Sequence, residues 1–193
     1  MIAHLELLNR SWFLLLNAYP GTSTVLLTFA TVCAQYTLFI IPATLMGLWF
    51  FGGKIGHRQA LFSLTTILVA LGLSFVCSLL WFHPRPFMIP LGYTWIYHAE
   101  ETSFPSDHAT LFFSASFSLL LMGARISGGL ILFLSFLVAW SRVFLGVHFP
   151  LDMLGALMVS VLACLLVYPL WRLLGKPLTS LCEDISARLF TRL

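Results

Sequence analysis

Two long uncharged apolar segments constrain the fold more than any other feature of this sequence. Residues 22–51 and residues 59–82 contain no Asp, Glu, Lys or Arg. Each segment is longer than the roughly 20 apolar residues that a helix needs to cross the hydrocarbon core of a bilayer. Only 9% of the chain is charged, whereas ordinary soluble domains are about 25% charged. The sequence therefore predicts an integral membrane protein surrounded by lipid, and we expect no nucleic-acid partner.

Three further apolar segments are shorter, and they cover residues 109–123, 126–140 and 153–171. The first two reach spanning length only if the helices also include polar residues at 106–108 and 141–146. We therefore expect an all-α protein, a polytopic membrane helix bundle with five transmembrane helices. Residues 1–193 are expected to form a single integral-membrane domain.

The two ends of the chain mix apolar and charged residues. Residues 4–17 combine leucines, Trp12 and Phe13 with Glu6 and Arg10, which predicts an amphipathic helix lying in the membrane interface. A short sixth membrane helix is the alternative for this segment. Residues 176–193 also alternate apolar and charged side chains, and we expect a second surface helix there.

Three short polar blocks interrupt the apolar pattern, each at the end of a predicted span. They are Arg85-Pro86, the run Pro105-Ser106-Asp107-His108, and Ser141-Arg142 followed by His148 and Asp152. Five antiparallel spans bring all three blocks to the same face of the membrane. Because ionisable groups are costly near lipid, such a cluster indicates a functional site.

The basic residues are distributed unequally between the two faces. Counted on the five-span topology, the face with the polar blocks holds three of the ten basic residues, Arg10, Arg85 and Arg142. The opposite face holds the other seven, which are Lys54, Arg58, Arg125, Arg172, Lys176, Arg188 and Arg192. Lys and Arg concentrate in cytoplasmic loops. The polar blocks are therefore expected on the extracytoplasmic side of the cytoplasmic membrane.

The residue types in the blocks suit phosphate binding. Pro105 is favourable in the first turn of a helix, so the amides near Ser106 and His108 would lie at the positive end of a helix. Such helix ends bind anions. Arg85 and Arg142 can add bidentate guanidinium contacts that match phosphate geometry.

The third block also contains a candidate nucleophile. His148 lies four residues before Asp152, so the carboxylate can bind one imidazole nitrogen and set the tautomer, which leaves the other nitrogen free to attack phosphorus. His108 is the candidate general acid that protonates the departing oxygen. This chemistry requires neither a metal nor an organic cofactor.

These blocks resemble the type 2 phosphatidic acid phosphatase superfamily of membrane lipid phosphatases. The pattern of that family is a lysine with a later Arg-Pro, then Pro-Ser-x-His, then Ser-Arg-x5-His-x3-Asp. The second and third blocks match completely, as PSDH and SRVFLGVHFPLD. The resemblance implies a metal-free reaction through a phosphohistidine. It assigns His148 as nucleophile, Asp152 as its orienting partner, His108 as acid and then base, and Arg85, Ser106 and Arg142 as phosphate ligands.

One position departs from the family pattern. The lysine expected seven residues before Arg85 is replaced by Ser78, which removes a cationic phosphate ligand. His83 is a candidate to compensate for it. The loop at residues 88–104 contains His98, Glu100 and Glu101, which we interpret as surface charges or a lid over the head group, with a metal contact as the alternative.

The short chain, its amphipathic start and Arg-Pro-Phe at 85–87 resemble the bacterial undecaprenyl-diphosphate phosphatase branch. This resemblance implies hydrolysis of the terminal phosphate of undecaprenyl diphosphate, the carrier lipid of cell-wall synthesis. Transfer of the phosphate to another lipid such as lipid A, or hydrolysis of phosphatidate or phosphatidylglycerol phosphate, are alternatives. A transporter or non-catalytic membrane protein is the alternative from another class, and the sequence leaves the oligomeric state open.

Overall fold

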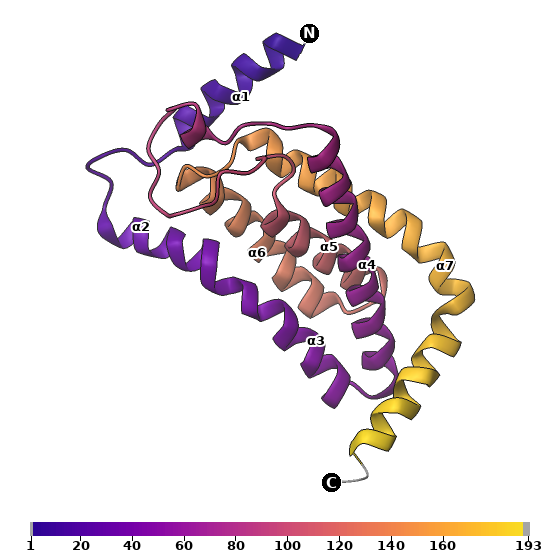
Figure 1. The fold of residues 1–193 in the computed structure, drawn as a ribbon. Helices are drawn as coiled ribbons and strands as arrows, with labels where there is room; N and C mark the ends of the chain where they lie inside the picture. Colours follow the sequence, from indigo (N-terminus) through magenta and orange to yellow (C-terminus); the bar gives the residue numbers. More distant parts are fainter. Residues whose placement is uncertain (1, 191–193) are drawn as a thin grey trace.

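The computed structural model describes residues 2–190, and this part of the chain is entirely helical outside its loops (Figure 1). The prediction of an all-α membrane protein is therefore confirmed. The elements in chain order are α1 (Ile2–Leu16), α2 (Thr24–Thr31), the π-helical turn η1 (Val32–Tyr36), the 3₁₀ turn η2 (Thr37–Phe39), α3 (Ile40–Phe51), α4 (Gly53–Leu80), the 3₁₀ turn η3 (Pro86–Met88), α5 (Asp107–Leu121), α6 (Arg125–Phe144) and α7 (Pro150–Phe190).

Four of the expected spans are long and apolar enough to cross a bilayer. The first runs over Thr24–Phe51 and joins α2 to α3 through the η1 and η2 turns, while the others are α4, α6 and α7. Many of their large apolar side chains are exposed, including Phe75, Leu79 and Leu165. Such exposure is stable only against lipid, because soluble proteins rarely expose large apolar patches.

The remaining expected span, at residues 109–123, forms α5, which is shorter than the other four spans. Its 15 residues extend about 22 Å at 1.5 Å per residue, less than the roughly 30 Å hydrocarbon core. It packs against α4, α6 and α7 in the interior of the bundle (Figure 1). Ser116 Oγ donates to the carbonyl of Gly128 on α6, an interhelical bond of the kind that holds membrane helices together. α5 is thus bonded directly to α6 in the interior of the bundle.

The expected amphipathic helix at 4–17 is present as α1, which is not among the four long apolar spans. It projects beyond the other helices at the end of the bundle where α4 finishes (Figure 1). Asn9 and Phe13 are buried, and Asn9 Oδ1 accepts a hydrogen bond of 3.0 Å from the amide of Leu151. Leu7 and Leu15 are exposed. One face of α1 therefore packs against the bundle through Asn9 and Phe13, and another face exposes the apolar side chains of Leu7 and Leu15.

The prediction of a separate surface helix at 176–193 is wrong for the described residues. α7 continues as one helix to Phe190, with Pro169 and Pro177 inside it, and residues 191–193 lie outside the described part. Proline removes one backbone hydrogen bond and kinks a helix rather than necessarily ending it. Figure 1 shows the result, since the C-terminal part of α7 turns at an angle to the part that packs in the bundle.

Candidate active site

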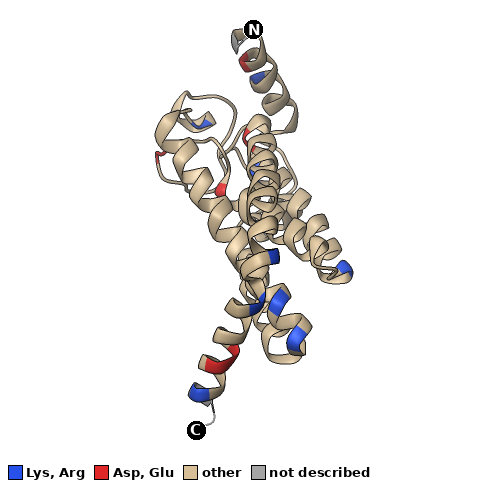
Figure 2. Ribbon diagram, turned by 90° about the vertical axis from the view of Figure 1, so that its right-hand side faces the viewer, with Lys and Arg blue, Asp and Glu red and all other residues tan. Residues whose placement is uncertain are grey.

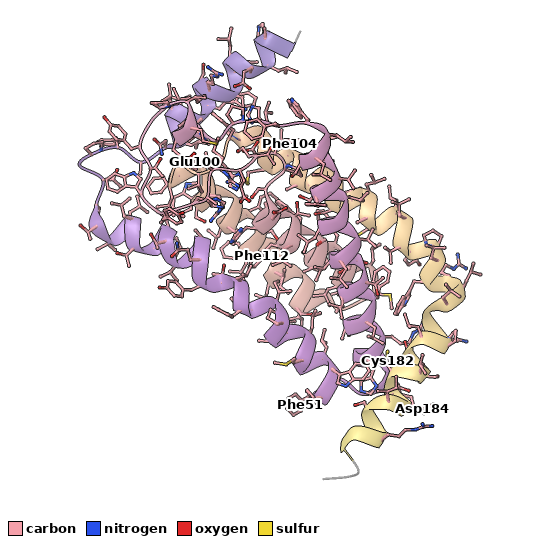
Figure 3. The ribbon with its side chains drawn as sticks, viewed as in Figure 1. Phe51, Glu100, Phe104, Phe112, Cys182 and Asp184 are labelled. Atoms are coloured by element: carbon pink, nitrogen blue, oxygen red, sulfur yellow. The ribbon has the colours of Figure 1, made fainter. Side chains whose placement is uncertain are left out.

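The three polar blocks meet at one end of the bundle, where the loop at residues 81–106 covers the loop at 145–149. The amide of Trp95 donates to the carbonyl of Leu145 over 3.0 Å, and the indole of Trp95 donates to the carbonyl of Ala18. Figure 3 shows Glu100 and Phe104 of the longer loop at this end, away from Phe112 in the middle of the bundle. Segments far apart in the sequence therefore assemble the candidate site.

His148 is buried at this point, with 2% of its surface exposed. Its Nδ1 lies 3.0 Å from the carbonyl of Ser103 and 3.3 Å from Oδ2 of Asp152. Both partners are acceptors, so Nδ1 carries the proton and Nε2 has the free lone pair. The contact between His148 and Asp152 that the sequence predicts is therefore present. α7 begins between the two residues, and its first turn brings the carboxylate of Asp152 to the imidazole.

The carboxylate of Asp152 is held by two further donors. The amide of Phe149 donates to its Oδ2 over 2.7 Å, and the hydroxyl of Ser103 forms a short hydrogen bond to the same oxygen. Ser103 is fully buried and was not singled out from the sequence. No motif marks it, because its position depends on the amide of Ser103 pairing with the carbonyl of His83.

Arg85 contacts the other side of the imidazole. Its Nη1 donates to His148 Nε2 over 2.9 Å and to the carbonyl of Val147 over 3.0 Å. Its Nε and Nη2 donate to the backbone carbonyl and the carboxylate of Glu101, over 3.2 and 3.3 Å. Glu101 is 59% exposed at its side chain. An acidic loop residue therefore occupies the guanidinium face that would bind phosphate.

Arg142 and Ser106 are buried without partners. Arg142 is 2% exposed and Ser106 is fully buried. Across residues 2–190, Nε and Nη2 of Arg142 and Oγ of Ser106 find no hydrogen-bond acceptor or donor. Ser106 precedes α5, but its side chain does not cap that helix. Because a buried unpaired cation is strongly unfavourable, these groups indicate an anion site.

His108, the second residue of α5, lies at the same end. The charges of Arg142, His98 and Arg85 act on His108, and His108 in turn acts on His148. The structure therefore brings all six candidate residues together, namely Arg85, Ser106, His108, Arg142, His148 and Asp152.

The electrostatics of the site favour a neutral His148. Burial, reinforced by the positive charges of Arg85 and Arg142, holds the pKa of His148 well below its usual value. Burial and the same two guanidinium groups lower the pKa of His98 to about 4. Burial also lowers the pKa of Arg85, opposed by the charge of Glu101. Since only a neutral imidazole has a lone pair, these shifts keep His148 reactive at neutral pH.

Two further residues have roles that differ from the sequence-based interpretation. Ser78, at the position of the family lysine, donates to the carbonyl of Phe104 over 3.3 Å. His83 does not replace that lysine, since its nitrogens face the carboxylates of Glu6 and Asp152, at 3.3 and 3.8 Å. Among the described residues, no three His, Cys, Asp or Glu side chains are close enough to hold a metal ion.

Relatives with similar sequences cover almost the whole chain. A putative undecaprenyl-diphosphatase of Escherichia coli K12, YbjG, is 37% identical over 175 residues, which are 90% of this chain and 88% of that protein. Undecaprenyl-diphosphatase BcrC of Bacillus subtilis is 28% identical over 96% of this chain and 95% of its own length.

Two solved structures share the fold. Crystal structures of LpxE from Aquifex aeolicus (TM-score 0.65, 22% identity, 84% of this chain and 95% of that one) and of a PAP2-type phosphatidylglycerolphosphate phosphatase from Bacillus subtilis (TM-score 0.59, 21% identity, 88% and 85%) align with it. The profile of the PAP2 superfamily matches residues 59–176, a range that includes all three polar blocks. The chain therefore belongs to the PAP2 superfamily.

Proposed function

We propose that this protein is a membrane phosphatase that hydrolyses the terminal phosphate of a lipid diphosphate, converting undecaprenyl diphosphate to undecaprenyl phosphate and inorganic phosphate. The observation that carries the proposal is that buried His148 keeps its Nδ1 proton towards Asp152, which leaves Nε2 unprotonated, while buried Arg142 has two nitrogens, Nε and Nη2, without hydrogen-bond partners among the described residues. The first group is a nucleophile and the second binds an anion. The similarity to two undecaprenyl-diphosphatases supports the choice of substrate.

In the proposed reaction, Nε2 of His148 attacks the terminal phosphorus while Asp152 holds the Nδ1 proton. The bond from that phosphorus to the bridging oxygen breaks, and His108 donates a proton to the departing lipid monophosphate. Arg142, Arg85 and Ser106 bind the phosphoryl oxygens. His108 then takes a proton from water as the water attacks the phosphohistidine, which releases phosphate and restores His148.

A cavity of about 650 Å³ beside the site supports a lipid substrate. Its α4 side presents apolar residues, including exposed Phe75 and Leu79, and its other side includes Glu101 and Asp107. Glu101 also contacts Arg85. The cavity thus runs from the lipid-facing side of α4 to Glu101, the residue that contacts Arg85, which suits a substrate with an apolar chain and an anionic head.

We also propose that the site lies on the extracytoplasmic face of the cytoplasmic membrane. Figure 2 shows Lys and Arg gathered at the end of the bundle that contains the C-terminus, away from α1. Lys54, Arg58, Arg125 and Arg172 belong to that end, near helix termini or the bend of α7. Positive residues concentrate on the cytoplasmic side. Arg192, counted in the sequence, lies outside the described residues.

The test is phosphate release by the purified protein from undecaprenyl diphosphate, phosphatidate and phosphatidylglycerol phosphate, with and without chelator. We expect prompt release from the diphosphate, unaffected by chelator, and none after His148→Ala. The control is His57→Ala, because His57 bonds Glu183 at the opposite end of the bundle. Full release by His148→Ala contradicts the mechanism. Release that requires an added lipid acceptor identifies a phosphotransferase instead.

A further inference from the structure

Asp152 has one carboxylate oxygen that the proposed mechanism does not use. Its Oδ2 binds Ser103, Phe149 and His148, whereas Oδ1 is buried without a hydrogen bond among the described residues. Nδ1 of His83 lies 3.8 Å from Oδ1. That nitrogen is also buried and unpaired. A potential donor and a potential acceptor therefore face each other, just beyond hydrogen-bond distance.

The second nitrogen of His83 faces another carboxylate. Nε2 lies 3.3 Å from Oε2 of Glu6 on α1, and Oε1 of Glu6 accepts a 2.7 Å hydrogen bond from Arg10. Burial raises the pKa of Glu6, but the hydrogen bonds from Arg10 and His83 outweigh it, so that the pKa lies below the usual value. Glu6 is therefore an anion at neutral pH. An imidazole between two carboxylates satisfies both only when both nitrogens carry protons.

The surroundings hold the ring of His83 in place. It is 9% exposed and packs edge-on against Phe149, with ring centres 5.3 Å apart. The backbone amide of His83 donates a hydrogen bond of 3.1 Å to the hydroxyl of Thr102. The titratable and charged groups facing it are Glu6 and Arg10 on α1 and Asp152 on α7, with Arg85 and His148 beyond that carboxylate.

We propose that His83 is a positioning residue, which links Glu6 of the N-terminal helix to Asp152 and thereby keeps the proton of His148 on Nδ1. An imidazole N–H beside Oδ1 keeps the carboxylate of Asp152 oriented, so that Oδ2 continues to accept from His148. The inference rests on the proposed function for its kinetic consequence. α1 also contacts this end of α7 through Asn9 and Leu151, so docking of α1 is coupled to the state of the nucleophile.

The first experiment compares phosphate release by the wild type, His83→Gln and Glu6→Gln. We expect His83→Gln to lower kcat about tenfold, because Oδ1 of Asp152 loses the imidazole that faces it, with KM changed less than about twofold because the phosphate ligands remain. Glu6→Gln should lower kcat in the same direction by a smaller factor, because Nε2 of His83 then faces an uncharged side chain.

Arg10→Gln is the matched control. It removes the exposed partner of Glu6 and leaves both contacts of His83 in place, and we expect a wild-type kcat. A His83→Gln protein with wild-type kcat, or with a reduced kcat but a wild-type His148 tautomer and a lower Tm, overturns the proposal, since either result leaves His83 with at most a structural role.

A second experiment separates this proposal from the proposed function. The ring ¹⁵N NMR signals of His148 report its tautomer in the resting protein, whether or not the substrate is correct. We expect protonated Nδ1 in the wild type and in Arg10→Gln, and a mixture with protonated Nε2 in His83→Gln. An unchanged His148 tautomer in His83→Gln overturns the positioning role. Absence of phosphate release by the wild type contradicts the function alone.

Discussion

Nη1 of Arg85 donates a hydrogen bond to Nε2 of His148 over 2.9 Å, so the arginine occupies the lone pair that is proposed to attack phosphorus. Because the guanidinium also contacts Glu101, substrate binding must replace both contacts. A phosphate offers the arginine a stronger, charge-assisted acceptor than an imidazole does. In the proposed mechanism, the same movement that binds the phosphate therefore exposes the nucleophile.

Replacing Arg85 by Lys keeps the charge but removes the planar fork that reaches both His148 and the phosphate. We expect kcat/KM for the diphosphate to fall by about a hundredfold, equal to roughly 2.7 kcal/mol. Steady-state kinetics of phosphate release measure this change. Arg125→Lys, at the start of α6 on the opposite end, should leave kcat/KM unchanged. Unaltered kinetics in Arg85→Lys contradict the role of the fork.

Arg142→Met should abolish activity and raise stability. The buried guanidinium of Arg142 has two unpaired nitrogens, and replacing buried charges by apolar side chains of similar volume often stabilises proteins by about 1–4 kcal/mol. Thermal unfolding in detergent, without phosphate, measures the gain in Tm. Inorganic phosphate should raise the Tm of the wild type and not that of the variant. A lower Tm in Arg142→Met would show that the arginine is satisfied in the resting protein.

Ser103→Ala should lower kcat with little change in KM. The hydroxyl of Ser103 donates to Asp152, which holds His148 and is not one of the proposed phosphate ligands. Loss of a buried hydrogen bond to a charged group is worth about 1.5–3 kcal/mol, or at least about tenfold in rate. Ser11→Ala is the control, because Ser11 bonds only the carbonyl of Leu7 on α1. A rise in KM alone would place Ser103 in substrate binding.

Gly146→Ala should destabilise the loop that carries His148. Gly146 has φ +82°, and a Cβ there would collide with the carbonyl of Tyr93. A non-glycine residue in such a conformation costs about 1–3 kcal/mol before any clash, so both Tm and activity should fall. Gly129→Ala is the comparison, since a Cβ there meets no atom within 4 Å and alanine favours helix by up to about 1 kcal/mol.

Stability should decrease as the pH falls from 7 towards 4. The unfolded chain binds a proton at His98 near its ordinary pKa of about 6.5, whereas the folded protein holds that pKa at about 4. The unfolded state thus binds more protons in this window, which lowers the free energy of unfolding with acidity. Tm measured against pH should show a smaller decrease in His98→Gln. An equal decrease in both proteins contradicts a neutral, partly buried His98.

Local features of this protein follow from the sequence alone. Uncharged runs predict membrane helices because a bilayer tolerates few charges, and the four-residue spacing of His148 and Asp152 predicts their contact because Pro150 starts a helix between them. The family motif identifies the six candidate residues because all of them lie in three short blocks of sequence. The continuity of α7 through Pro169 and Pro177 does not follow from the sequence, because proline occurs both at helix kinks and at helix ends.

Only the tertiary structure decided which distant groups meet. Ser103 reaches His148 and Asp152, Glu101 reaches Arg85, and Glu6 reaches His83 across 77 residues of chain. Each of these contacts depends on how the 81–106 loop and α1 pack over the bundle, and no periodicity or spacing encodes that path. Sequence patterns report local geometry and burial, whereas contacts between irregular segments arise from packing of the whole chain.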